Sequence, residues 1–160
     1  MRENTLARRI AFWLSVAAGL VFAIVPLPEW LDTVRPDVAL LAVIYWTLAS
    51  PRIAGLGAAW IAGLLLDMLK GFVLGQHALG FLVVGFVAHR LQLRMRMFTI
   101  LQQAAVVLLL LFLYHFIVFW IDGMIGHGLT LWARWLPVLS GAVLWPLIAT
   151  TGDSMSRRSR

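Results

Sequence analysis

A run of 25 residues without a formal charge, Met97–Ile121, is the feature that most restricts what this chain can fold into. A helix that crosses a bilayer needs about 20 predominantly apolar residues, within a range of about 17 to 25. Three further uncharged runs, Ile10–Pro28, Gly71–His89 and Trp135–Gly152, have a similar length. The composition agrees, since 62% of the residues are apolar and 12% charged, whereas about a quarter of a soluble domain is charged. The sequence therefore predicts an all-α integral membrane protein.

The middle of the chain is less regular. Val38–Pro51 and Ile53–Leu66 are 14 residues each and are separated only by Arg52. At about 1.5 Å per residue, each covers about 21 Å, less than the hydrocarbon core of about 30 Å. The segments are either two short spans or a re-entrant hairpin. We favour two short spans, because charged side chains at their ends can extend to the membrane surfaces.

The first apolar run also resembles a signal peptide, but "VFAIVPLPEW" contains no good cleavage site with small residues. We therefore expect a retained helix and one transmembrane domain over residues 1–160. Its six expected helices lie at about 9–28, 37–51, 53–67, 72–89, 97–121 and 135–152.

Basic residues predict the orientation of these six helices. If the N-terminus is cytoplasmic, ten arginines lie on the cytoplasmic side and only Arg35, Lys70 and Arg134 lie outside. This asymmetry follows the positive-inside rule. We therefore expect both termini in the cytoplasm and the segment 122–134 outside, with four tryptophans near the outer surface: Trp30, Trp120, Trp132 and Trp135.

Small residues recur at every fourth position of the third expected helix. Gly55, Ala59 and Gly63 form one row, beside a second row of alanines at positions 54, 58 and 62. Such rows allow helix backbones to approach closely in lipid. We expect this helix to be central in the bundle, whereas the fifth helix, rich in large residues, should expose much of its surface to lipid or to an apolar partner helix.

The chemistry-bearing residues form no catalytic or metal-binding pattern. The sequence has no cysteine, no HExxH, no G-x-S-x-G, no P-loop and no carboxylate pair within a span. His115, the one histidine well inside a helix, is expected to be neutral and bonded to a neighbouring helix. We expect no enzyme activity, no metal and no cofactor. The basic residues are expected to contact anionic lipid headgroups rather than nucleic acid.

An ordered set of features from Arg35 to Phe81 resembles the core of the rod shape-determining protein MreD family. In chain order, its matching positions are Pro36 and Asp37, Tyr45 and Trp46, Pro51, Gly63 to Asp67, Gly71, Gly75, Ala78 and Leu79. The resemblance covers about 45 residues closely, and the whole chain in length and in the layout of six spans. Lys70 is not part of the family pattern.

The resemblance implies a non-enzymatic protein of the bacterial inner membrane that acts in cell elongation. It implies binding to MreC, and membership of a complex with the actin-like MreB, the glycan polymerase RodA and its transpeptidase, which builds lateral peptidoglycan. It also implies a fold similar to the substrate-binding subunits of energy-coupling-factor transporters. A competing function is therefore a small-molecule-binding subunit of a vitamin-type transporter, with an outer pocket that includes Gln76, His77 and His127.

The charges around the second and third expected helices suggest a polar cluster at the outer surface. Because a very short turn joins these helices, their outer ends should be close. We expect Arg35 to pair with Asp67, and Asp37 to lie near the fourth helix, so that the cluster holds the short helices in register and shapes an outer pocket. Gly71 and Gly75 should permit the tight turn into the fourth helix.

Overall fold

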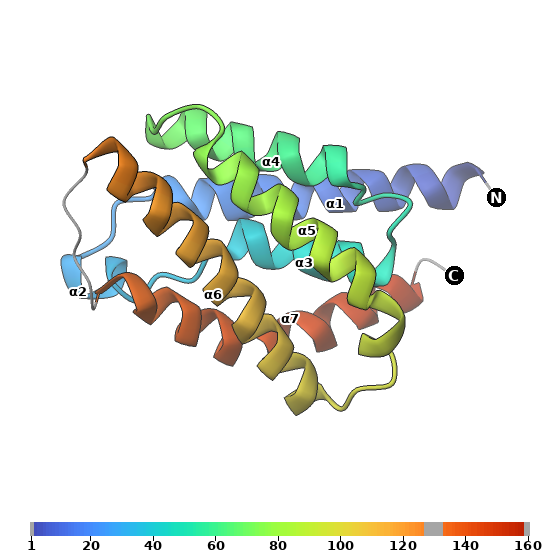
Figure 1. Cartoon of the computed structure of the whole chain (residues 1–160). Helices are drawn as coiled ribbons and strands as arrows, with labels where there is room; N and C mark the ends of the chain where they lie inside the picture. The colour runs from blue at the N-terminus through green and yellow to red at the C-terminus, as the bar shows by residue number, and fades with distance from the viewer. Residues whose placement is uncertain (1, 127–132, 159–160) are drawn as a thin grey trace.

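The computed structural model describes residues 2–126 and 133–158, and the regular structure in these residues is entirely helical (Figure 1). Its elements are α1 (Arg2–Ile24), α2 (Glu29–Asp32), α3 (Val38–Ala49), α4 (Leu56–Lys70), α5 (Gln76–Met95), α6 (Ile100–Ile125), the 3-10 helix η1 (Ala133–Trp135) and α7 (Leu136–Arg158).

Each of the six ranges expected from the sequence overlaps one of the longer helices. Among the described residues, three helical segments are long and apolar enough to cross a membrane: Thr5–Ile24, Gln76–Met95 and Ile100–Ile125. Val38–Ala49 and Leu136–Gly152 are shorter apolar helices. The fold is thus that of an all-α membrane protein, and the number of spans stays a prediction.

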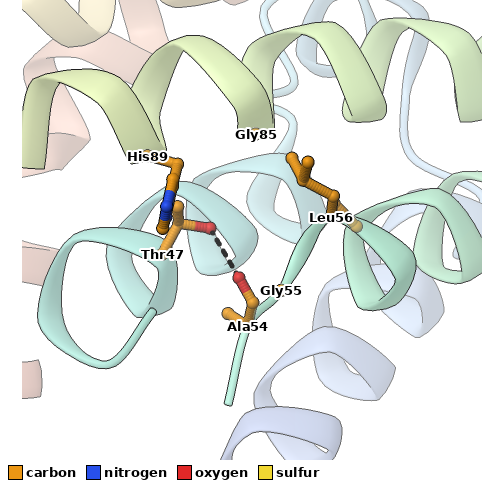
Figure 2. A pocket seen from close by; sticks show the side chains of 7 residues that line it. Thr47, Ala54, Gly55, Leu56, Gly85 and His89 are labelled. Carbon is orange, nitrogen blue, oxygen red and sulfur yellow. Dashed lines mark hydrogen bonds between the residues drawn. The ribbon is translucent and has the colours of Figure 1, made fainter. Parts of the chain in front are cut away.

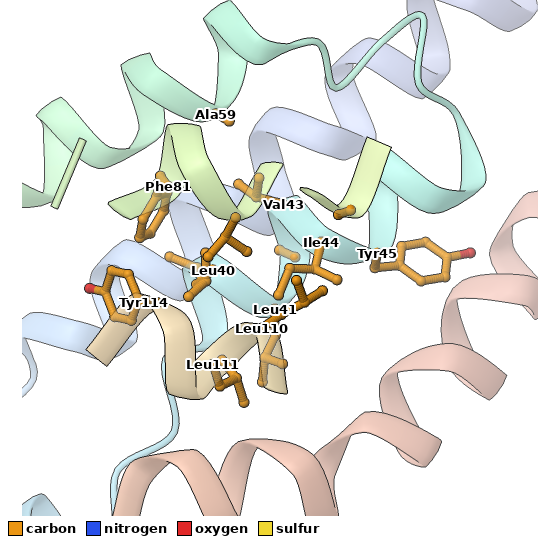
Figure 3. Close-up of a cluster of buried hydrophobic side chains, with 14 of the residues drawn as sticks. Leu40, Leu41, Val43, Ile44, Tyr45, Ala59, Phe81, Leu110, Leu111 and Tyr114 are labelled. Atoms are coloured by element: carbon orange, nitrogen blue, oxygen red, sulfur yellow. The ribbon is translucent and has the colours of Figure 1, made fainter. Parts of the chain in front are cut away.

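The short helix α3 lies at the centre of the bundle. Residues 39–45 and Thr47 are buried, and α3 contacts α1, α5 and α7. Figure 3 shows Leu40 and Val43 of α3 in one apolar cluster with Phe81 of α5 and Tyr114 of α6. A helix that is apolar on all sides is expected to be buried on all sides, and α3 fits that rule. The sequence predicted that the next helix, α4, would be central. In the structure, α3 is the central helix instead.

Helix α4 packs along α5 through its small residues. Ala59 is fully buried, and a Cβ atom added at Gly63 would overlap the backbone of Ala78. A Cβ at Gly85 of α5 would lie 3.2 Å from the Cβ of Ala59. The predicted close approach of backbones is therefore present at Ala59 and Gly63. Gly55 does not take part, because it precedes the helix as its N-cap and open space surrounds its Cα.

Helix α6 has one face in the core and one face at the surface. Its inner face buries Val107, Leu111 and Tyr114, among others. Its outer face exposes six large apolar residues, Leu101, Leu109, Phe112, Phe116, Trp120 and Met124. The expectation of a helix that exposes much apolar surface holds for this outer face.

The two ends of the bundle carry different charges. Helix α1 begins and α7 ends at one end, beside the turns 50–55 and 96–99 (Figure 1). We call it the arginine end, after Arg8, Arg9, Arg52, Arg90, Arg94 and Arg96. The opposite end, with the turns 25–37 and 71–75 and the C-terminus of α6, is called the aspartate end, after Asp32, Asp37, Asp67 and Asp122.

Candidate functional site

Asp67, in the last turn of α4, caps the start of α5. Its side chain is fully buried. Oδ2 accepts hydrogen bonds from the backbone N–H groups of Gly75 and Ala78, at 2.9 and 3.3 Å, and Oδ1 accepts one from His77 at 2.9 Å. The first N–H groups of a helix have no partner within the helix, and a carboxylate there also interacts favourably with the helix dipole. Asp67 thus performs from a neighbouring helix the task of an N-cap side chain.

The ring of His77 completes this contact. Its Nδ1 lies 2.7 Å from Oδ1 of Asp67, and the ring is 5% exposed. On its other sides it packs against Phe72 and Tyr114, with ring centroids 5.0 and 6.1 Å away. Because His77 is held by a charge and two aromatic rings, its orientation is fixed by the fold.

Two glycines allow the chain to turn between α4 and α5 within five residues. Gly71 has φ +68° and ends α4, and Gly75 has φ +102° and precedes α5. Both values lie in the left-handed region, where a Cβ atom is unfavourable. The expectation that these glycines permit the tight turn is confirmed, and the turn is what places Asp67 over the first N–H groups of α5.

Asp122, near the end of α6, forms a second polar contact at the aspartate end. Its Oδ1 accepts a hydrogen bond from Nε2 of Gln76 at 2.6 Å, and Oδ2 forms an ion pair with Arg134 of η1. Asp122 and Gln76 are 3% and 2% exposed. This contact ties the start of α5 to the end of α6 and to the segment that precedes α7.

Asp37 and His115 form a third polar contact. Nε2 of His115, in the middle of α6, lies 2.8 Å from Oδ2 of Asp37, the residue that precedes α3. The two residues are 78 positions apart in the chain. His115 is thus bonded to a neighbouring element, as expected from the sequence. Asp37 bonds to α6 and lines the same cavity as Gln76 and His77, so it lies near the start of α5, the fourth expected helix, as predicted.

These three contacts surround a cavity of about 280 Å³. We call Asp37, Asp67, Gln76, His77, His115, Asp122 and Arg134 the polar cluster. All but Asp67 line the cavity, together with Asp32, Thr33, Lys70, Phe72, Tyr114, Val118 and Pro137. A pocket is therefore present at the end of the bundle where the sequence predicted one, but its walls come from α5, α6 and η1 as well as from the short helices.

The predicted ion pair between Arg35 and Asp67 is wrong. Arg35 donates to the backbone oxygens of Ala23, at 2.6 Å, and Val25, and it pairs with Asp32 at 3.0 Å. The last carbonyl groups of a helix are unpaired and attract cations, so the end of α1 binds Arg35. The first N–H groups of a helix are also unpaired and attract anions, so the start of α5 binds Asp67. Arg35 and Asp67 therefore have different partners.

The remaining candidate residues lie outside the polar cluster. Pro36 accepts a hydrogen bond from the N–H of Val38, at 2.9 Å, in the turn before α3. Nε1 of Trp46 donates to Oγ of Ser15 at 3.0 Å and so joins α3 to α1. Gly55 borders a second cavity, of about 250 Å³, with Thr47 and His89 (Figure 2). This cavity has mainly apolar and backbone walls, and no charged group among its described residues.

The contact of Asp122 with Gln76 and Arg134 cannot be deduced from sequence alone, although Gln76 was expected to line a pocket. These residues come from separate parts of the chain, and the sequence indicates only a polar residue near a helix end for each of them: Gln76, Asp122 and Arg134. A possible signal is Asp122 itself, because a carboxylate at the end of a long apolar helix requires a partner. His127 and Trp132, also singled out from the sequence, lie outside the described residues.

Comparison with known proteins decides the family. The model of the rod shape-determining protein MreD family matches residues 6–151, nearly the whole chain. The chain belongs to the MreD family. A relative from Haemophilus influenzae, described as rod shape-determining protein MreD, is 26% identical over 145 residues, which cover 88% of this chain and 90% of the relative. No solved structure matches the chain.

The MreD match includes every residue of the polar cluster, from Asp37 to Arg134. Membership of this family and the apolar helices together identify a bacterial membrane protein of the rod-shape system. The polar cluster is thus a feature of the part of the chain that carries the MreD resemblance.

Proposed function

We propose that the chain is a non-enzymatic inner-membrane component of the cell-elongation complex. In this role it binds MreC and helps to couple MreB filaments to lateral peptidoglycan synthesis by RodA and its transpeptidase. The observation that carries the proposal is the match to the MreD family over residues 6–151. The family match does not favour the alternative of a vitamin-type carrier subunit.

The contacts of three aspartates in the polar cluster support a structural role. Asp67 binds three backbone N–H groups and His77, Asp122 binds Gln76 and Arg134, and Asp37 binds His115. A general acid or base needs a group free to exchange a proton with a substrate. Here the carboxylates already fix the positions of helices, so their role is to hold α3 to α6 in place.

The charge distribution supports six spans with both termini in the cytoplasm. The arginine end carries the start of α1, the turn 50–55 and the turn after α5, which is the arrangement expected of a cytoplasmic face. The turn 50–55 reaches the same end as the start of α1, which supports two complete short spans over a re-entrant hairpin.

The outer face of α6 is the surface that best fits a partner helix. Leu109, Phe112, Phe116 and Trp120 are 64%, 47%, 43% and 61% exposed. Aromatic residues are enriched at the centres of interfaces and often supply most of the binding energy. We therefore assign this face to the transmembrane helix of MreC, with the other exposed apolar faces in contact with lipid.

The experiment expresses the tagged chain in rod-shaped cells depleted of their own MreD, and measures cell shape and the recovery of MreC from solubilised membranes. The chain should restore rods and retain MreC. Leu109→Ala combined with Phe116→Ala should reduce MreC recovery several-fold. Leu139→Ala combined with Val143→Ala, at exposed positions of α7, is the matched control and should retain it. If the first double variant retains MreC and the control loses it, the interface lies on α7. A chain that restores rods without retaining MreC would disprove the proposed partner.

A further inference from the structure

Three segments meet around a cavity at the arginine end. It has a volume of about 380 Å³ and lies between the start of α1, the turn 50–55 and the residue that follows α5. Each segment contributes one arginine: Arg8, Arg52 and Arg96. Ser50 also lines the cavity, and no acidic residue is among the described residues that do so.

The three arginines of this cavity lack counter-charges in the described part of the chain. Arg35 and Arg134 at the aspartate end are each paired with an aspartate. By contrast, no ion pair with a described carboxylate involves Arg8, Arg52 or Arg96. Nε of Arg8, like Nε of Arg35, is buried without a hydrogen-bond partner. Arg8 is half-buried, whereas Arg52 and Arg96 are exposed. Three positive charges thus line one cavity without a described acidic neighbour, so the cavity is suited to an anion. Guanidinium groups bind phosphate oxygens through paired hydrogen bonds, which favours a phosphate group.

The surroundings of the cavity indicate that the phosphate belongs to a lipid. On α1, Leu6 and Ile10, which lie two residues before and two residues after Arg8 in the sequence, are 63% and 51% exposed. Beyond Arg96, Met97 and Leu101 are 81% and 82% exposed. In a membrane these side chains contact lipid acyl chains, so the cavity lies beside lipid headgroups, and a phospholipid can place its phosphate there.

We propose that this cavity binds the phosphate of one anionic phospholipid, with its acyl chains along the exposed residues of α1 and α6. The site differs from general attraction to a charged membrane, because its three arginines come from separate segments and converge on one cavity. The bound lipid therefore links α1, the turn between α3 and α4, and the turn between α5 and α6. The proposal does not depend on the proposed partner MreC.

The test purifies the full chain in detergent and measures, by native mass spectrometry, the retention of phosphatidylglycerol relative to phosphatidylcholine. Arg8→Gln combined with Arg96→Gln removes two arginines of the cavity. Arg9→Gln combined with Arg94→Gln removes two charges at the same end that do not line it. A lost hydrogen bond between a charged arginine and the phosphate lowers binding by about tenfold or more, whereas an arginine outside the cavity makes no such bond. The cavity variant should therefore lose about tenfold or more of its phosphatidylglycerol retention, and the control less than about twofold.

A second variant, Ser50→Phe, fills the cavity without a change in charge and should cause a similar loss. Circular dichroism of each variant identifies any that fails to fold. Equal losses in the cavity and control variants, or full retention by Ser50→Phe as a folded protein, would show that the attraction is diffuse and overturn the proposal. Inorganic phosphate that displaces the lipid at millimolar concentration would show that the site takes soluble phosphate, and would overturn it as well.

Discussion

Oδ1 of Asp67 lies 2.7 Å from Nδ1 of His77 and 2.9 Å from its backbone nitrogen, so that one carboxylate oxygen contacts both the ring and the main chain of the same residue. The other oxygen contacts Gly75 and Ala78. A single side chain of α4 thereby fixes the start of α5, and the tight turn between them depends on it. This relationship explains why a charge is present at the end of an otherwise apolar helix.

Asp67→Asn should destabilise the protein on the order of 3 kcal/mol. The amide keeps one acceptor oxygen but turns an NH2 group toward backbone donors, so charged hydrogen bonds worth about 1.5 to 3 kcal/mol are lost and a buried donor is left unpaired. Denaturation of the purified protein in detergent measures the effect. Arg35→Gln acts on α1 instead, so the effects of the two substitutions should add within about 0.5 kcal/mol. A double variant no worse than either single variant would contradict the separate roles of these residues.

Gly63→Ala should destabilise the protein although alanine favours helix formation. The added Cβ would overlap the backbone of Ala78, and overpacking typically costs about 1 to 3 kcal/mol. Gly57→Ala on the same helix is the matched control, since nothing lies within 4 Å of its added Cβ. It should be neutral or stabilising by up to about 1 kcal/mol. Gly63→Leu should act more strongly and separate α4 from α5. Equal stability of the Gly63→Ala and Gly57→Ala variants would mean that the helices do not pack this closely.

The effects of Asp37→Asn and His115→Gln on the free energy of unfolding should be coupled. The two side chains are 18% and 11% exposed and contact each other, so once either is replaced, the other replacement removes little more. A double-mutant cycle measured by thermal unfolding should give a coupling energy of about 1 kcal/mol or more. The pair Asp37→Asn and His89→Gln serves as the reference, because His89 lies beside the apolar cavity far from Asp37 along the bundle, and its coupling should be near zero. Coupling of equal size in both pairs would rule out a specific contact.

The orientation can be tested by cysteine labelling, because the sequence contains no cysteine. Glu29→Cys and Arg52→Cys place exposed thiols at the aspartate and arginine ends. A membrane-impermeant maleimide added to intact cells should label Glu29→Cys alone, and both variants after the membrane is opened. Labelling of Arg52→Cys in intact cells would place the arginine end outside, and no labelling of it under either condition would favour the re-entrant hairpin. A reporter fused after Arg160 should be active only in the cytoplasm.

The sequence predicted contacts between neighbouring segments more successfully than the partners of charges. The close approach at Gly63 and the glycine turn before α5 follow from local spacing and backbone freedom, which are visible in the chain itself. Proximity of opposite charges predicts Arg35 as the partner of Asp67, but the unpaired N–H groups at the start of α5 are closer and bind the carboxylate instead. Asp122 and Gln76 are 46 residues apart, so their contact depends on how α5 packs against α6.

The burial of α3 also has a consequence for how the chain enters the membrane. The 12 residues of α3 extend about 18 Å, less than the bilayer interior of about 30 Å. The chain is synthesised from its N-terminus, so α3 leaves the ribosome before α5 and α7, two of the helices that pack against it. Until these arrive, α3 by itself is too short to reach both membrane surfaces, and Asp37 lacks His115. We therefore expect α3 to reach its final position late, when the last third of the chain has been made.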